Sequence, residues 1–127
     1  MAIPLRFEGF SLRVSDVERS LAFYRDQLGF TVEQRHGRMF ALLRLGEGTI
    51  GLLHGDLARW PVEAREQFHI ELATDDLDGL YAELQAKGVH FTEPPHDAPW
   101  ERAMVARDPD GYHVEFAQGR RGQNRPT

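Results

Sequence analysis

The sequence predicts an α+β protein built from two copies of a βαβββ module. The segments 9–17 and 69–77 both alternate like a strand and then continue with helical periodicity, and they begin 60 residues apart in a chain of 127 residues. Each copy then reaches a glycine, Gly29 or Gly88, that is suited to end a helix. Because half of this chain is too short to bury a core alone, we expect the two modules to form a single domain.

The first module, about residues 5–55, begins with a strand that has one apolar face. Its less apolar face carries Gly9, Ser11 and Arg13. Ser15 then predicts the N-cap of an amphipathic helix, in a capping box with the glutamate three residues later. Three further strands are expected after the helix, at residues 30–35, 39–45 and 49–54.

The second module, about residues 67–118, repeats this order. Asp75 and Asp78 predict the N-terminus of its helix. A Pro-rich loop, residues 93–99, is expected to form a fixed rim. The strands expected in this module after the helix cover residues 89–92, 102–107 and 112–118. A linker, residues 56–66, joins the modules, and residues 119–127 form a basic, solvated tail.

Composition narrows the class of protein. A net charge of −5 argues against a nucleic-acid partner, which needs a basic face. No apolar run approaches the roughly 20 residues of a membrane-spanning helix, and the N-terminus does not resemble a signal peptide. The chain has no cysteine, so disulfides and thiolate metal sites are excluded. These features predict a cytoplasmic protein that binds neither nucleic acid nor membrane.

Two motifs resemble a known superfamily. They are SLRVSD with SLAFYRDQLGF, at residues 11–16 and 20–30, and RDPDGYHVEF at residues 107–116. Together with the repeat, they are similar to the vicinal oxygen chelate superfamily, which holds glyoxalase I, bleomycin-resistance proteins and extradiol dioxygenases. The resemblance implies a cup-shaped mixed sheet in each module and a homodimer. It does not identify the function, because related folds host different chemistry.

The resemblance also implies where a divalent metal would bind. Carried over residue by residue, the ligand positions are Gly9, Leu52, His69 and Glu115, of which the last two can bind metal. His54 lies two residues beyond Leu52 and therefore on the same face of its strand, which makes it a candidate third ligand. The sequence thus leaves two alternatives: no complete metal site, or a Zn, Ni, Mn or Fe site that uses His54, His69 and Glu115.

Other side chains are candidates for contacts with a small molecule. Trp60 and Trp100 lie in loops, where they either seal the ends of the sheet or line a pocket. Arg13 is expected on the same kind of polar face as Glu71, as a counter-ion or as a clamp for an anionic group. His113 is either an acid–base group or a neutral, hydrogen-bonded histidine. The candidate ligand-binding residues are Ser11, Arg13, Trp60, Glu71, Trp100 and His113.

Two functions follow from these residues. The first is a metal-independent small-molecule-binding protein similar to the bleomycin-resistance proteins, which the missing ligands at Gly9 and Leu52 favour. The second is a metal-dependent lyase, transferase or dioxygenase that uses His69, Glu115 and a non-standard third ligand such as His54. The histidine and glutamate at the two remaining ligand positions favour the second, and no catalytic residue is assigned.

Overall fold

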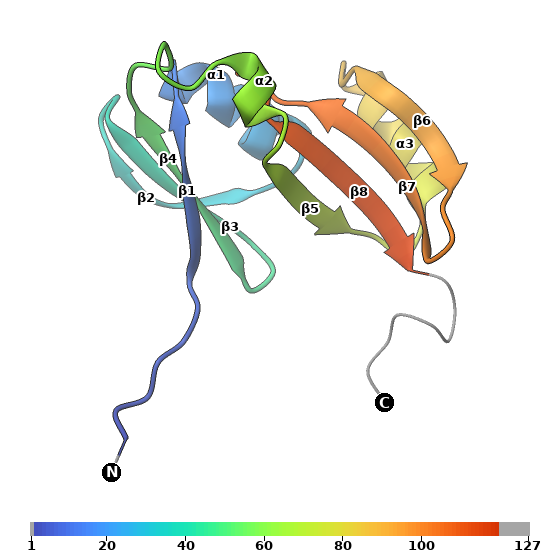
Figure 1. Ribbon diagram of the computed structural model, residues 1–127, viewed down its shortest axis with the longest axis horizontal. Helices are drawn as coiled ribbons and strands as arrows, with labels where there is room; N and C mark the ends of the chain where they lie inside the picture. The colour runs from blue at the N-terminus through green and yellow to red at the C-terminus, as the bar shows by residue number, and fades with distance from the viewer. Residues whose placement is uncertain (1, 120–127) are drawn as a thin grey trace. The chain divides into compact units, whose positions relative to one another are not determined.

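The computed structural model describes residues 2–119 and contains two βαβββ units, as predicted (Figure 1). The chain divides between Leu57 and Ala58, inside the expected linker. The predicted basic tail lies almost entirely outside the described residues. Among residues 2–119, no helix has the length and apolar character needed to cross a membrane.

The first unit is a four-stranded sheet in the order β1-β4-β3-β2. Its first and last strands are neighbours and run parallel, whereas the other pairs are antiparallel. The strands are β1 (Gly9–Val14), β2 (Thr31–His36), β3 (Phe40–Leu45) and β4 (Gly48–His54). The helical segment between β1 and β2 begins as α1 (Val17–Leu21) and continues as the π-helix η1 (Ala22–Gln27), which the sequence did not predict.

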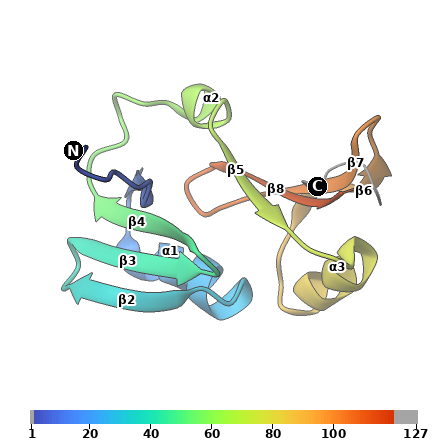
Figure 2. The ribbon, with the colours of Figure 1, turned by 90° about the horizontal axis from the view of Figure 1, so that it is seen from below.

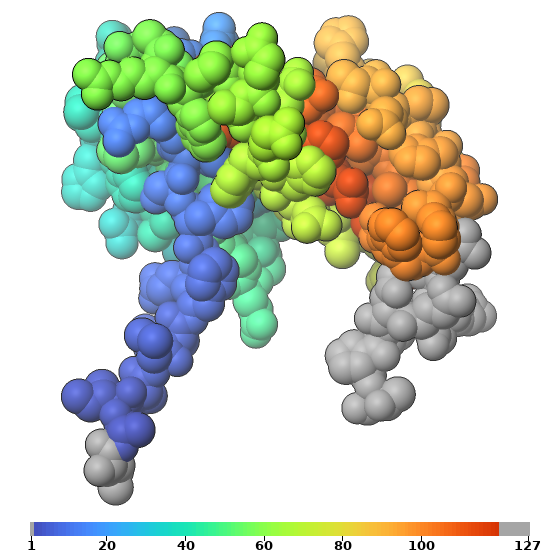
Figure 3. All heavy atoms as spheres, viewed as in Figure 1, coloured from blue at the N-terminus to red at the C-terminus, as the bar shows by residue number. Residues whose placement is uncertain are grey.

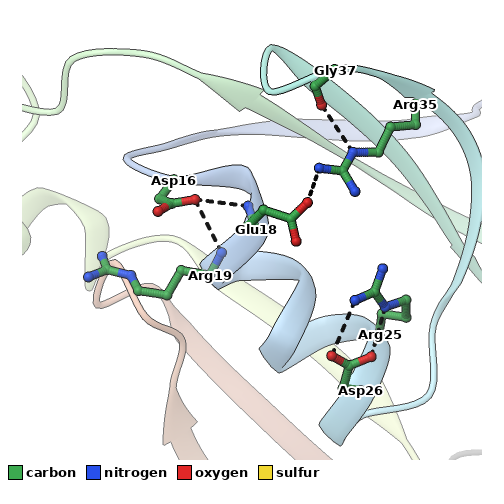
Figure 4. A network of polar contacts seen from close by, with 7 residues as sticks. All are labelled: Asp16, Glu18, Arg19, Arg25, Asp26, Arg35 and Gly37. Atoms are coloured by element: carbon green, nitrogen blue, oxygen red, sulfur yellow. Dashed lines mark hydrogen bonds and ion pairs between the residues drawn. The ribbon is translucent and has the colours of Figure 1, made fainter.

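The N-cap of α1 is Asp16 and not the predicted Ser15 (Figure 4). The Asp16 carboxylate accepts hydrogen bonds from the backbone N–H groups of Glu18, at 2.9 Å, and Arg19, at 3.3 Å. The Ser15 hydroxyl instead accepts a hydrogen bond from the Arg19 side chain. The Glu18 side chain forms an ion pair with Arg35 on β2. This ion pair links α1 to the edge strand of its own sheet.

The second unit repeats the topology, with the order β5-β8-β7-β6. The helix α3 (Leu77–Ala86) packs against β6, β7 and β8 on one face of the sheet (Figure 2). The strands are β5 (His69–Ala73), β6 (Phe91–Asp97), β7 (Glu101–Arg107) and β8 (His113–Gly119). A short helix, α2 (Val62–Arg65), precedes β5 within the segment predicted as linker.

Two local predictions for the second unit were wrong. The N-cap of α3 is Asp76, whose carboxylate accepts from Gly79 N at 3.0 Å, and not Asp75. Strand β6 runs through Pro94 and Pro95, where the sequence predicted a loop. β6 lies at the edge of the sheet, and register shifts interrupt its pairing with β7. Proline has no backbone N–H to donate, and at this irregular edge strand the lack of that donor is tolerated.

In both units the core lies on the sheet face that the helix covers. In β1 and β4 the buried residues include Leu12, Val14 and Leu52, and in β8 they include Val114 and Phe116. Alternation along a strand then places the neighbouring residues on the opposite face. That opposite face carries the polar side chains of the candidate site.

Candidate functional site

The polar face of the second unit brings four of the predicted site residues together. β5 and β8 are adjacent and parallel, with His69 opposite His113 and Glu71 opposite Glu115. Residues opposite one another on neighbouring strands point to the same face. The local sequence therefore builds two rungs across this strand pair, one of histidines and one of glutamates.

Three of these side chains form a compact cluster. The ligand-type atoms of His69, His113 and Glu115 all lie within 4.8 Å of one another. The two imidazole rings are stacked, with centroids 3.9 Å apart and planes inclined by 13°. The side chains of His113 and Glu115 are 12% and 20% exposed, and the His113 Nε2 to Glu115 Oε1 distance is 3.9 Å. This cluster includes His113, which the sequence predicted as a ligand-binding residue and not as part of a metal-type group.

Arg107, from the end of β7, determines the state of the His113 ring. Its Nη1 lies 3.3 Å from His113 Nδ1, and because a guanidinium only donates, Nδ1 must accept and Nε2 must carry the hydrogen. Burial lowers the pKa of His113, and the charges of His69 and Arg107 lower this pKa further. His113 is therefore neutral at pH 7, and its buried Nε2–H has no hydrogen-bond partner.

At the other end of β7, Glu101 contacts the cluster through Glu115. Burial raises the pKa of Glu101, and a hydrogen bond to Glu115 together with the charge of that carboxylate raises this pKa further. The Trp100 indole N–H donates to Glu101 and has the opposite, weaker effect on its pKa. A second carboxylate this close disfavours the charged form of Glu101.

Replacing Glu101 by glutamine is expected to stabilise the protein at pH 7. The pKa of Glu101 is raised in the folded state, so the folded protein retains a proton that the unfolded chain releases as the pH rises above the ordinary glutamate pKa of 4.5. The wild type therefore loses stability above this pH, whereas Glu101→Gln does not and still accepts from Trp100. Denaturant unfolding in EDTA should show no difference at pH 4 and a gain of about 0.5 kcal/mol at pH 7. The exposed control Glu83→Gln should show no such pH-dependent gain, and an equal gain for both variants would contradict the explanation.

The residues of the cluster do not fit a metal ion as they are arranged. The donor types are suitable, since two imidazole nitrogens and a carboxylate oxygen are common ligands. However, the His69 and His113 rings are nearly parallel, so the lone pairs in their planes do not converge on one point. Arg107 also directs a fixed positive charge at the His113 ring. We therefore derive no metal-assisted step from this geometry.

Strand pairing in the first unit shows that one of the ligand positions carried over from the superfamily, Leu52, was wrong. Gly9 lies opposite Thr49 and Ser11 opposite Gly51, in the same positions as the two rungs of the second unit. The counterpart of Glu115 is therefore Gly51, whereas Leu52 is fully buried in the core. A one-residue shift changes the face of a strand, which is why the prediction of Leu52 was wrong.

Both glycine positions of the first unit are crowded, and Gly9 is crowded by backbone. A β-carbon at Gly9 would overlap the carbonyl oxygen and hydroxyl of Thr49, and Gly9 has a φ of +143°. A β-carbon at Gly51 would lie 2.6 Å from Ser11 Oγ. Gly9, at the position of His69, is thus closed by the Thr49 backbone, whereas a side chain at Gly51, the position of Glu115, requires the Ser11 side chain to move.

His54 occupies the last position of β4, opposite Val14. It shares a face with Leu52, as parity predicted, but this is the face that carries the core residues of the first unit. His54 itself is exposed at the end of the strand. Its use as a third metal ligand stays a prediction.

The two tryptophans differ in their surroundings. The Trp60 ring lies 5.6 Å from the ring of buried Tyr112, and Arg65 from α2 donates to the Trp60 carbonyl oxygen. Trp100, in the turn between β6 and β7, is 61% exposed and hydrogen-bonds Glu101. Trp60 therefore covers the core of the second unit, and Trp100 presents more of its ring to solvent.

The remaining predicted residues are Ser11 and Arg13, both exposed on β1 of the first unit. The sequence reasoning missed Glu101 and Arg107 as members of the site. Arg107 was detectable, because it shares a tight hairpin with His113 and the two residues pair directly. Glu101 was not, because the predicted strand began one residue later.

The fold and the sequence place the chain in one superfamily. The sequence profile of the Glyoxalase/Bleomycin resistance protein/Dioxygenase superfamily matches residues 6–116. This match covers most of the chain, and the two βαβββ units agree with it. The chain therefore belongs to the Glyoxalase/Bleomycin resistance protein/Dioxygenase superfamily, as the sequence motifs predicted.

Three similar proteins illustrate the range of this superfamily. The uncharacterized protein YraH of Bacillus subtilis is 34% identical over 83% of this chain and 91% of its own. A lactoylglutathione lyase of Haemophilus influenzae is 27% identical over 86% of this chain and 89% of its own. The crystal structure of TnmS3, an antibiotic binding protein from Streptomyces sp. CB03234, is 30% identical, covers 94% of this chain and 99% of its own, and has a TM-score of 0.70.

Proposed function

We propose that the protein is a cytoplasmic, homodimeric, metal-independent binding protein for a small organic molecule. The observation that carries this proposal is the arrangement of His69 and His113, whose rings are stacked and of which His113 is held in one tautomer. Arg107 holds His113 as the neutral tautomer with its hydrogen on Nε2, and the stacked His69 ring prevents the two histidines from converging on an ion. Such a site offers hydrogen bonds and flat surfaces to an organic ligand.

The groups around the pair define what the ligand should provide. His69 supplies an exposed imidazole ring stacked on His113, and Glu71 supplies an exposed acceptor on the next rung. Trp100 adds an exposed aromatic surface beside Glu101. Sites for small molecules combine aromatic surface with a few polar groups in this way. The antibiotic-binding TnmS3 and the bleomycin-resistance branch of the superfamily indicate aromatic antibiotics as the first ligands to test.

The proposal is tested by equilibrium binding in EDTA, followed by tryptophan fluorescence and calorimetry. Metal-free bleomycin is the first probe, and a panel of aromatic natural-product antibiotics is the second. Trp100→Ala and His113→Ala should each weaken binding by about tenfold or more. Trp60→Phe, which keeps an aromatic ring against Tyr112, should bind like the wild type. If none of these probes binds the wild type, the proposal is wrong.

A second candidate is the metal-dependent enzyme, which one observation favours. Members of the superfamily often bind a divalent metal, and His69, His113 and Glu115 form a group of three suitable donors. Binding would require one imidazole ring to turn and Arg107 to leave His113. Ni, Zn, Mn and Fe should be titrated into the apo protein, His69→Ala and Glu115→Ala, with the loop variant His96→Ala as the control. Stoichiometric binding lost in the first two variants alone would favour this enzyme over the binding protein.

A further inference from the structure

One row of side chains crosses three strands of the sheet in the second unit. His69 on β5 lies opposite His113 on β8, and His113 lies opposite Arg107 at the end of β7. Residues opposite one another on neighbouring strands point to the same face. Figure 3 shows part of this sheet, with red-orange atoms of β8 visible between yellow-green atoms of the segment before β6 and orange atoms of β7. The polar face of the sheet therefore carries a guanidinium beside the two imidazole rings.

The Arg107 guanidinium has a contact on each side. Its Nη1 lies 3.3 Å from His113 Nδ1, and its Nη2 lies 3.9 Å from a carboxylate oxygen of Glu66, at the C-terminal end of α2. An arginine side chain is always charged in proteins and can only donate hydrogen bonds. The row therefore ends in a permanent positive charge, and α2 helps to place this charge through Glu66.

This contact leaves His113 without a lone pair for a metal ion. Its Nδ1 lone pair accepts from Arg107, and its Nε2 carries the hydrogen of the neutral ring. A histidine binds metal through an unprotonated ring nitrogen, so His113 cannot be a ligand while Arg107 donates to it. The guanidinium would also repel a divalent cation in the cluster. Arg107 thus opposes metal binding in two separate ways.

The other residues of the cluster do not oppose a metal in the same way. Two imidazole nitrogens and one carboxylate oxygen are the ligand set of one class of catalytic zinc site. The ligand atoms of His69, His113 and Glu115 lie within 4.8 Å of one another, whereas those of a tetrahedral zinc site lie about 3.4 Å apart. Rotation of side chains over about 1 Å closes this difference once the His113 ring is released from Arg107.

We propose that Arg107 is the positioning residue that keeps this site free of metal. Its guanidinium supplies a fixed positive charge where superfamily members often bind a divalent metal, and it occupies the lone pair of His113 that a metal would need. The inference rests on the proposed metal-independent function and names the residue that determines it. It implies that loss of this one side chain turns His69, His113 and Glu115 into a metal site.

Calorimetric titration with Zn²⁺ and with Ni²⁺ tests this implication. Arg107→Met should bind one ion per chain at least tenfold more tightly than the wild type. Arg107→Lys, which keeps a charged donor, should behave like the wild type. Arg38→Met is the control for net charge, because Arg38 lies exposed in the turn between β2 and β3, and it should gain no metal. Combining Arg107→Met with His69→Ala or with Glu115→Ala should abolish the gain.

The same titration separates this inference from the proposed function. If neither the wild type nor a folded Arg107→Met protein binds metal, the inference is wrong and the metal-independent function stands. If the wild type binds one ion per chain as tightly as Arg107→Met does, both are wrong. Circular dichroism of each variant establishes that it is folded before the titration.

Nitrogen-15 NMR of the imidazole rings tests the positioning role in the wild type, where no substitution can disturb folding. The His113 signals, assigned by their loss in His113→Gln, should show a protonated Nε2 and an unprotonated Nδ1 at pH 7. In Arg107→Met this preference for one tautomer should weaken, and in Arg107→Lys it should be retained. A wild-type ring protonated on Nδ1 would overturn the proposal.

Discussion

Gly9→His is expected to destabilise the first unit by about 3 kcal/mol or more and not to supply a metal ligand. Gly9 has a φ of +143°, and any β-carbon there would overlap the Thr49 carbonyl oxygen and hydroxyl. The histidine would therefore separate β1 from β4 before its ring reached the polar face. Because both tryptophans belong to the second unit, unfolding should be followed by circular dichroism as well as fluorescence.

Ser11→His is the matched control for this substitution. It places the same imidazole two residues further along the same exposed side of β1. We expect it to cost less than about 1 kcal/mol, as exposed strand substitutions usually do. A stable Gly9→His protein that bound one metal ion per chain would contradict this prediction. It would show that the clash with Thr49 is not what keeps a ligand side chain out of the first unit.

Asp108→Ala is expected to destabilise the second unit by about 3 kcal/mol. The Asp108 side chain is buried in the turn between β7 and β8 and accepts from the backbone N–H groups of Asp110 and Tyr112, each at 2.9 Å. Alanine would leave both buried donors without this partner. The turn also sets Arg107 opposite His113, so the variant should lose ligand affinity as well as stability.

Asp108→Asn separates the hydrogen bonds from the charge. The asparagine side-chain oxygen accepts both bonds, so this variant should lie within about 1 kcal/mol of the wild type. Both variants are to be unfolded in urea at pH 7 with tryptophan fluorescence as the probe. An asparagine variant as unstable as the alanine variant would mean that the carboxylate charge, and not the two bonds, holds the turn.

The fold was largely predictable because its determinants are local. The strands were recognised from the alternation of apolar and polar residues before positions 17 and 77. The helices were recognised from the periodicity after these positions and from the terminating glycines Gly29 and Gly88. Each of these signals involves only residues that are close together in the sequence. Both glycines have positive φ, as the sequence predicted for helix ends. The capping errors, Ser15 for Asp16 and Asp75 for Asp76, were shifts of one position. Adjacent polar residues are equally good caps until packing fixes where the first turn begins.

The candidate site was predictable only in part, because it depends on the register between strands. Parity along each strand correctly placed His69 and Glu71 on one face of β5, and His113 and Glu115 on one face of β8. It could not determine which residue of β4 is the counterpart of Glu115, since a shift of one residue reverses the face.

Periodicity and motifs along the chain were sufficient to identify the repeat and the superfamily, and to place His69 with Glu71 and His113 with Glu115 on one face of their strands. The tertiary structure decided that His113 stacks on His69, that Arg107 fixes its tautomer, and that Glu101 meets Glu115. It also decided that Gly9 is closed by Thr49. The physical reason is that periodicity acts along the chain, whereas contacts between strands depend on pairing and close packing, which join residues distant in sequence.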